Sequence, residues 1–153
     1  MKFVSSFSSH NGVAEWQRRE LYDWATDLFM VPGLEVAYGC TSAIRKHLRD
    51  ELTNAGWSYN VRIDPQFDLT VTGIYRDTAF QIQTGNIARA IYDLIKLQHL
   101  YASHKIQAAA IAVPTKPAAA LIGSNVANDE RLWGEVNLFD RIITVPLMLI
   151  SFE

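Results

Sequence analysis

The sequence predicts an α/β fold in which a central mixed β-sheet is flanked by α-helices. Segments with apolar residues at helical spacing alternate with β-prone segments along the whole chain. A short polar link between two extended segments is typical of an antiparallel hairpin, and a later, nearly continuous apolar run is typical of a buried central strand. The 153 residues suit one domain, 1–153, without a linker or an internal repeat.

The first part of the chain is expected to form a strand followed by a long helix. Residues 2–8 alternate in polarity and end at a His-Asn-Gly turn sequence, which indicates a strand. Residues 14–30 repeat apolar side chains at helical spacing, and the Pro-Gly pair at 32–33 ends this helix.

A second helix is expected from Thr41 or Ser42, either of which can cap it, to Gly56. Its apolar face consists of Ile44, Leu48 and Leu52. Its solvent side carries four basic residues: Arg45, Lys46, His47 and Arg49. This basic cluster is the best local candidate for phosphate contact, and a solvated helix face without a partner is the alternative.

Beyond Trp57 the pattern changes from helical to extended. The expected strands are 58–63, 67–75 and 78–84, and the short link at 75–77 predicts a hairpin between the last two.

The remaining elements alternate again between helix and strand. They are a helix at 86–104 that Thr84 or Asn86 can cap, a buried strand at 106–113, helices at 117–122 and 128–138, and a strand at 141–152. Pro146 predicts that the last strand is an edge strand or a bulged one.

Composition excludes several classes of function. The net charge of −2 gives no general attraction to a polyanion, so nucleic acid would need a local basic surface. No apolar run is long enough to span a bilayer and no secretion signal is visible, so a cytoplasmic protein without membrane contact is expected. Cys40 is the single cysteine, which excludes an internal disulfide, and a buried thiol is expected.

Polar side chains are expected to converge on one face of the predicted hairpin. Gln81 and Gln83 share a face because side chains alternate along a strand. Asp68 lies at the start of the partner strand, where the hairpin can bring it near them. A solvated sheet face without a site is the alternative interpretation.

Several motifs in this region resemble one nuclease superfamily. Phe67-Asp68-Leu69, with Gln81-Ile82-Gln83 thirteen residues further on, is similar to the D…(D/E)-x-K signature of the PD-(D/E)XK, or restriction-endonuclease-like, superfamily. The segments 80–87, 94–97 and 110–114 resemble type II restriction endonucleases of the BamHI/BglII-like group. So do the segments 49–52, with Trp57, and 76–78. The motifs are short, but their order along the chain also matches.

The resemblance implies a restriction-endonuclease-like fold, a DNA partner and a homodimer. In such enzymes two carboxylates hold Mg²⁺, which generates a hydroxide nucleophile, and a third residue orients the water. By this resemblance Asp68 would be the first metal ligand, Gln81 the second and Gln83 the water-positioning residue. Asp64 is a rival to Asp68 for the first position.

The sequence departs from the signature at its second position. Gln81 is neutral, and an amide oxygen is a weaker ligand than a carboxylate for a hard dication. Glu20 or Glu51 on a helix could supply the missing carboxylate.

Two functions are consistent with these features. One is a Mg²⁺-dependent DNA endonuclease of the restriction type, with Asp68, Gln81 and Gln83 at its site. The other is a catalytically inactive relative that serves as a DNA- or protein-binding, or regulatory, module. In either case the expected DNA contacts are Arg45, Lys46, Arg49, Asn86 and Arg89, and the backbone at Gly85-Asn86 could hold a phosphate.

Overall fold

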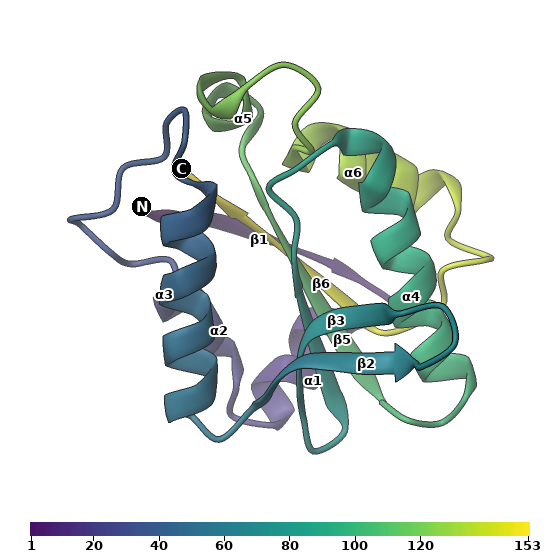
Figure 1. Cartoon of the computed structure of the whole chain (residues 1–153). Coiled ribbons are helices and arrows are strands. Elements are labelled where there is room, and N and C mark those ends of the chain that lie inside the picture. The colour runs from purple at the N-terminus through teal and green to yellow at the C-terminus, as the bar shows by residue number, and fades with distance from the viewer.

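The computed structural model describes all residues from 1 to 153, as a six-stranded sheet with helices on both faces (Figure 1). The strands are β1 (Phe3–Ser9), β2 (Ser58–Asp64), β3 (Leu69–Tyr75), β4 (Thr78–Ile82), β5 (Ala108–Pro114) and β6 (Leu147–Phe152). They lie in the order β1-β6-β5-β4-β3-β2. The central strands β4, β5 and β6 are parallel, and the remaining pairs are antiparallel. The predicted mixed sheet flanked by helices is therefore confirmed.

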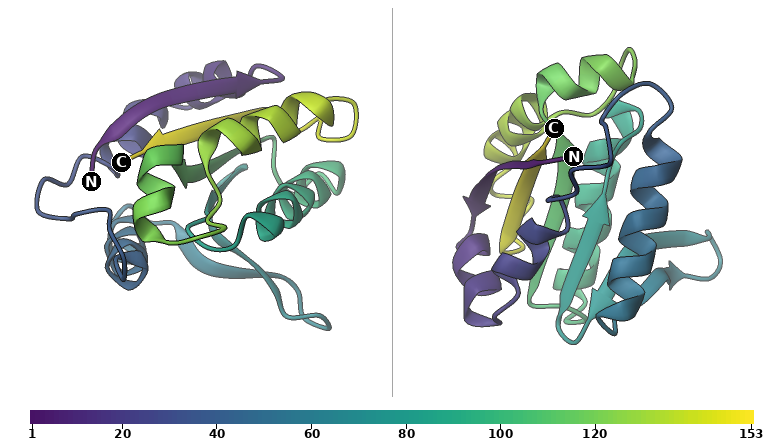
Figure 2. Two further views of the ribbon diagram at one scale, coloured as in Figure 1. Left: turned by 90° about the horizontal axis from the view of Figure 1, so that it is seen from above. Right: turned by 90° about the vertical axis from the view of Figure 1, so that its left-hand side faces the viewer.

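The helices form a layer on each side of the sheet (Figure 2). They are α1 (Gly12–Arg18), α2 (Tyr22–Asp27), α3 (Thr41–Asn54), the 3-10 turn η1 (Ile87–Arg89), α4 (Ala90–Ala102), α5 (Lys116–Ile122) and α6 (Asp129–Leu138). The core of α1, α2 and α3 covers one face, and that of α4 and α6 covers the other. None of the helices is long and apolar enough to cross a membrane.

The apolar strand β5 is buried on both faces, as its sequence predicts. Ala108, Ala110 and Ala112 belong to the core under α1–α3. Ala109, Ile111 and Val113 belong to the core under α4 and α6. Because side chains alternate across a strand, one apolar run supplies both layers.

A cluster of aromatic side chains joins the β2–β3–β4 part of the sheet to the first two helices. The ring of Trp57 stacks on Trp24 at a centroid distance of 5.1 Å, on Tyr75 at 5.5 Å and on Trp16 at 6.1 Å. A Cβ atom at Gly73 would lie 3.3 Å from the Trp57 ring, so glycine lets β3 approach it closely. This packing fixes the hairpin that carries Gln81.

A buried arginine ties the β3–β4 turn to α1. The Arg19 side chain is only 10% exposed and donates to both carboxylate oxygens of Asp77, at 2.9 and 2.5 Å. Arg19 also pairs with Glu15. The hydrogen bond from Arg19 lowers the pKa of Asp77, and the same contact raises the pKa of Arg19. The turn between the two site strands is therefore held at its tip.

The single helix predicted at 14–30 is wrong, because the structure has two short helices there. The break lies between α1 and α2, where Glu20 adopts the left-handed φ of 58°. The contact between Arg19 and Asp77 spans 58 residues, and it turns the Arg19 side chain inward at the end of α1. A tertiary ion pair thus overrides a local helical pattern.

The prediction for the last strand is also wrong. The strand begins at Leu147 rather than at residue 141, and β6 lies between β1 and β5 instead of at an edge. Pro146 precedes the strand, so its missing N–H interrupts no ladder, and its carbonyl accepts from the Ala109 N–H.

The predicted helix caps have mixed outcomes. Asn86 caps η1 by accepting from the Ala88 N–H at 2.8 Å, as expected. Thr84 does not, because its buried hydroxyl has no hydrogen-bond partner. Neither Thr41 nor Ser42 caps α3, whose preceding residue is Cys40, a buried free thiol. The predicted apolar face of α3 is confirmed by Ile44, Leu48 and Leu52, which are fully buried.

Candidate functional site

The strands β3 and β4 separate at the residues that resemble the nuclease signature. The hairpin pairs Tyr75 with Thr78 and Gly73 with Phe80, and the same register sets Thr72 opposite Gln81. At this pair, hydrogen bonds to the side chains of Thr72 and Gln81 take the place of the backbone hydrogen bonds between the strands. The Thr72 N–H donates to Gln81 Oε1 at 3.0 Å, and the Ile82 N–H donates to the Thr72 hydroxyl at 3.1 Å. Gln81 therefore has a structural role at the point where the sheet opens.

The second glutamine is fixed by the loop after β4 and by helix α4. Gln83 Oε1 accepts from the Gly85 N–H at 2.7 Å, and its Nε2 donates to Asp93 Oδ2 at 2.7 Å. Asp93 also forms an ion pair with Lys96 Nζ at 2.6 Å, and both side chains are largely buried. The amide of Gln83 is thus held at both ends by protein groups.

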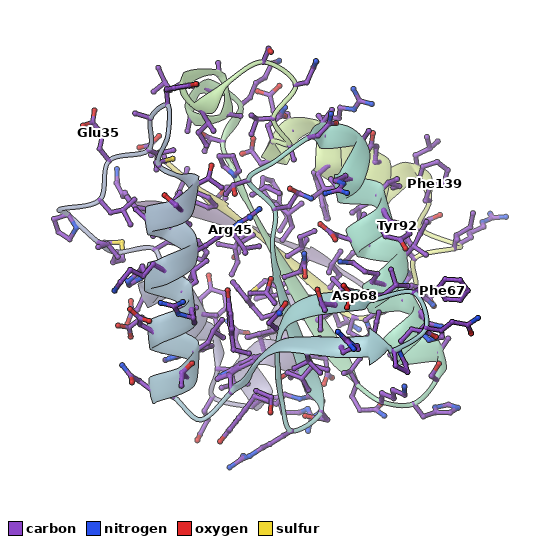
Figure 3. All side chains as sticks on the ribbon, in the orientation of Figure 1. Glu35, Arg45, Phe67, Asp68, Tyr92 and Phe139 are labelled. Atoms are coloured by element: carbon purple, nitrogen blue, oxygen red, sulfur yellow. The ribbon has the colours of Figure 1, made fainter.

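Three cavities adjoin at Arg45 and form one groove, here called the α3–α4 groove. Two of them lie between α3 and α4, where the hairpin opens, and the third lies between α3 and β2. Arg45 lines all three, and the largest has a volume of about 780 Å³. Figure 3 shows Arg45 on the side of α3 and Tyr92 on the side of α4. The α3–α4 groove is lined by Thr41, Ser42, Arg45, Lys46, Arg49, Tyr59, Asn60, Phe67, Asp68, Leu69, Thr70, Val71, Thr72, Gln81, Ile82, Gln83, Gly85, Asn86, Arg89, Tyr92, Asp93 and Lys96.

The groove is more basic than the chain as a whole. Its lining contains five basic side chains (Arg45, Lys46, Arg49, Arg89 and Lys96) and two acidic ones (Asp68 and Asp93), a net charge of +3. The whole chain carries −2. Cations collected in a concave surface attract and steer an anionic partner, even when the protein itself is acidic.

The residues expected to contact DNA all line this groove. Lys46 and Arg49 are partly neutralised by Asp50, which forms ion pairs with both. The hydrogen bond from Lys46 is the main cause of the lowered pKa of Asp50. Arg45 and Arg89 form no ion pair, so their charges are available to a ligand.

The two aspartates of the expected site lie at the β2–β3 turn. The Asp68 side chain is 75% exposed and pairs with Arg62 at 2.7 Å, while still lining the same cavity as Gln81 and Gln83. Asp64 Oδ1 accepts from the Gln66 and Phe67 N–H groups and so closes the turn. Asp68 precedes Thr72 by four residues, or roughly 13 Å along an extended strand. The hairpin thus places Thr72, and not Asp68, across from Gln81.

The donor set does not fit a divalent cation. No group of three or more His, Cys, Asp or Glu side chains is placed so that it could hold a metal ion. The oxygens of Gln81 and Gln83 already accept backbone N–H groups, and the one buried carboxylate beside them, Asp93, is paired with Lys96. Glu20 and Glu51, the expected compensating carboxylates, do not line the groove. Mg²⁺ needs several free and preferably anionic oxygens.

The sequence reasoning missed three residues of the site: Thr72, Asp93 and Lys96. Thr72 could have been found from the hairpin, because a turn at Arg76-Asp77 sets residue 72 opposite residue 81. Asp93 and Lys96 are three residues apart on one helix and therefore lie on the same face. No sequence pattern shows that this face meets Gln83.

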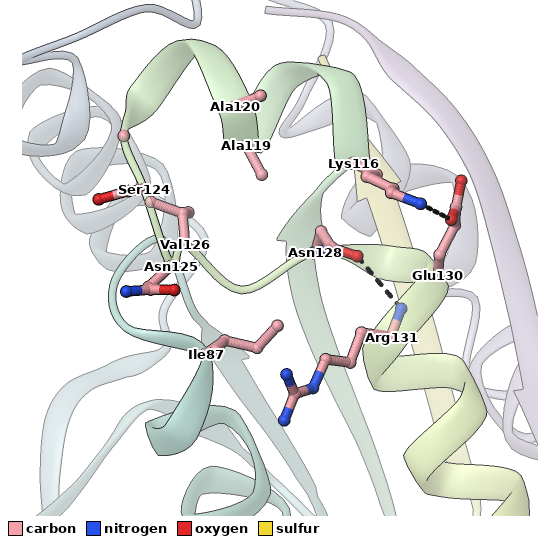
Figure 4. A pocket seen from close by; sticks show the side chains of 11 residues that line it. Ile87, Lys116, Ala119, Ala120, Ser124, Asn125, Val126, Asn128, Glu130 and Arg131 are labelled. Carbon is pink, nitrogen blue, oxygen red and sulfur yellow. Dashed lines mark hydrogen bonds and ion pairs between the residues drawn. The ribbon is translucent and has the colours of Figure 1, made fainter.

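Another cavity, of about 750 Å³, lies between α5, α6 and η1 (Figure 4). Its two cations form ion pairs with neighbouring carboxylates: Lys116 contacts Glu130 at 2.7 Å, and Arg131 contacts Glu135 at 2.9 Å. None of the expected site residues lines it. The α3–α4 groove is therefore the candidate site.

The sheet and helix arrangement defines the class of protein as a restriction-endonuclease-like fold, by its likeness to solved structures. The crystal structure of BglII complexed with a DNA 16-mer matches with a TM-score of 0.79 and 17% identity, covering 100% of this chain and 78% of that one. Free BglII matches with a TM-score of 0.75 and 18% identity, covering 100% and 80%. At such identities these matches establish the fold alone.

The family follows from the sequence itself. The family model for restriction endonucleases BglII/BglIII matches residues 20–152, so the chain belongs to this family. A comparison with curated protein sequences gives no match. The resemblance to the PD-(D/E)XK superfamily inferred from short motifs is thus confirmed.

Proposed function

We propose that this chain is a DNA-binding protein in which the α3–α4 groove holds the phosphate backbone of DNA. The observation that carries the proposal is the net positive groove in a net negative chain, with Arg45 and Arg89 unpaired in its lining. Phosphate contacts by Arg and Lys supply most of the affinity of a protein for DNA. The solved complex of the related BglII with DNA supports DNA as the partner.

We further propose that the site binds DNA without cutting it through a bound Mg²⁺ ion. Gln81 and Gln83 are neutral, and their oxygens are occupied by protein donors. The second candidate is the Mg²⁺-dependent endonuclease with Asp68, Gln81 and Gln83 at its site. It is favoured by one observation, the presence of Asp68 in the lining of the same cavity.

The groove is tested by reversing one of its unpaired charges. Arg45→Glu is expected to weaken binding to a labelled duplex by about tenfold or more near 0.1 M salt, because a phosphate contact becomes a repulsion. Fluorescence anisotropy over a series of salt concentrations measures both the affinity and the slope of log K against log salt. The slope should become shallower by the amount of about one phosphate contact, or roughly 0.9.

Lys105→Glu is the matched control, since Lys105 is exposed, forms no ion pair and lies outside the groove. It makes the same change in net charge. Equal losses in the two variants would mean that only the overall charge matters, and the groove would then not be the binding surface.

We also propose that the protein acts as a homodimer through the outer face of α4 and α6. Support comes from large exposed apolar side chains: Ile95 on α4 is 51% exposed, Leu138 at the end of α6 is 73% exposed, and Ile142 just after α6 is 64% exposed. Sedimentation equilibrium of the wild type should give twice the chain mass at micromolar concentration, whereas Ile95→Asp should give a monomer. A wild type that stays monomeric at all concentrations would rule this out.

A further inference from the structure

A largely buried lysine forms part of the groove wall beside the two glutamines. The Lys96 side chain is only 12% exposed, and with Gln81 it lines two of the three cavities of the groove. Its ammonium group pairs with Asp93 at 2.6 Å, donates to the Thr70 carbonyl at 2.7 Å, and lies 5.9 Å from the centre of the Tyr92 ring. These contacts fix the charge in place before any ligand arrives.

Lys96 retains donor capacity for a ligand. An ammonium group has three N–H donors, and the protein uses two of them here. A fixed and largely buried cation also interacts with an anion more strongly than an exposed lysine does. The pair with Asp93 leaves this charge only partly available.

We propose that Lys96 contacts a DNA phosphate in the groove. Its positive charge there takes the place of the charge that a metal ion supplies in metal-dependent enzymes. This inference rests on the proposed DNA-binding function. It adds that the site binds a phosphodiester without a divalent cation. It also adds that Asp93 positions Lys96 and partly neutralises its charge.

The two residues then have opposite effects on binding. Lys96→Gln removes a phosphate contact, so affinity for DNA falls about tenfold and the slope of log K against log salt becomes shallower by about 0.9. Asp93→Asn keeps an oxygen that accepts from Lys96 and loses the hydrogen bond from Gln83 to Oδ2. The full ammonium charge then faces the groove, and binding tightens several-fold. Asp68→Asn removes a carboxylate from the same cavity and controls for net charge, so equal tightening in Asp68→Asn and Asp93→Asn would count against a specific role of Lys96.

Lys96→Gln leaves Asp93 buried without its cation, and this can destabilise the fold. The double variant Asp93→Asn/Lys96→Gln keeps both shapes and removes both charges. It is expected to fold like the wild type and to bind DNA as weakly as Lys96→Gln does, with the same shallower slope.

The experiment is anisotropy of a fluorescein-labelled, mixed-sequence duplex in EDTA and in MgCl₂ at matched ionic strength. The wild type is expected to bind in EDTA and no more tightly in MgCl₂, because Mg²⁺ competes for the phosphates. In EDTA, Asp93→Asn is expected to bind more tightly than the wild type and the double variant more weakly. Binding only in MgCl₂, or binding unchanged in both Asp93→Asn and the double variant, would overturn the role of Lys96. If the wild type binds no duplex in either buffer, the proposed DNA-binding function itself fails.

Discussion

In the double variant Thr72→Asp/Gln81→Glu, the free energy of unfolding in EDTA is expected to fall by about 2–4 kcal/mol, because two like charges meet in a half-buried site. The Thr72 hydroxyl and Gln81 Oε1 are 3.3 Å apart, so the new carboxylates face each other across β3 and β4. A divalent cation between them relieves the repulsion. Adding Mn²⁺ or Mg²⁺ at about one hundred times its Kd should restore roughly 2.7 kcal/mol.

Thermal unfolding with and without metal measures this effect, and Thr72→Asn is the neutral control of similar shape. For the wild type and for Thr72→Asn, the melting temperature should not change between EDTA and Mn²⁺. The melting temperature of the double variant should rise in Mn²⁺. Equal stabilisation of all three proteins would mean that the metal binds elsewhere, or that the wild-type site already holds it.

In Trp57→Ala, the free energy of unfolding is expected to fall by about 3–5 kcal/mol, the usual loss for a large aromatic side chain removed from a core. Trp57 is 5% exposed and stacks on three other aromatic rings. Its removal separates the β2–β3–β4 part of the sheet from α1 and α2. For a domain of this size the melting temperature should decrease by roughly 10 °C or more.

Urea unfolding followed by circular dichroism gives the free energy directly. Tyr38→Ala is the control, since Tyr38 is 90% exposed and its removal should change stability by no more than about 0.5 kcal/mol. A loss below about 1 kcal/mol in Trp57→Ala would contradict the proposed link between the aromatic cluster and the hairpin.

The sequence predicted those parts of the fold that local patterns determine. The nearly continuous apolar run at residues 106–113 indicated a central strand, and the short link at 75–77 indicated the hairpin. The spacing of Ile44, Leu48 and Leu52 indicated the buried face of α3. Each of these signals lies within a short stretch of the chain.

Contacts between distant residues were beyond such patterns. The break at Glu20 lies next to the contact of Arg19 with Asp77, which is 58 residues away in the β3–β4 turn. The central place of β6 depends on its pairing with β1 and β5 at once. Neither contact can be predicted from the helix or strand propensities of the neighbouring residues.

The candidate site was predicted in part for the same reason. Gln81 and Gln83 were identified from the motif, and both line the same cavity. Asp68 was chosen by its spacing in the sequence, whereas the two-residue turn decides which residue faces Gln81. Asp93 and Lys96 reach the site from α4, and only the packing of that helix on the sheet reveals them.

The central claim is that this protein binds DNA and does not cut it with a bound metal ion. The most direct test is to incubate supercoiled plasmid with the wild type and Mg²⁺ or Mn²⁺. The DNA is then run on a gel both as the complex and after removal of the protein. We expect a retarded band in the first case and intact supercoiled plasmid in the second. Nicked or linear plasmid after removal of the protein, formed by the wild type but not by Asp68→Ala, would contradict the account and identify an active endonuclease.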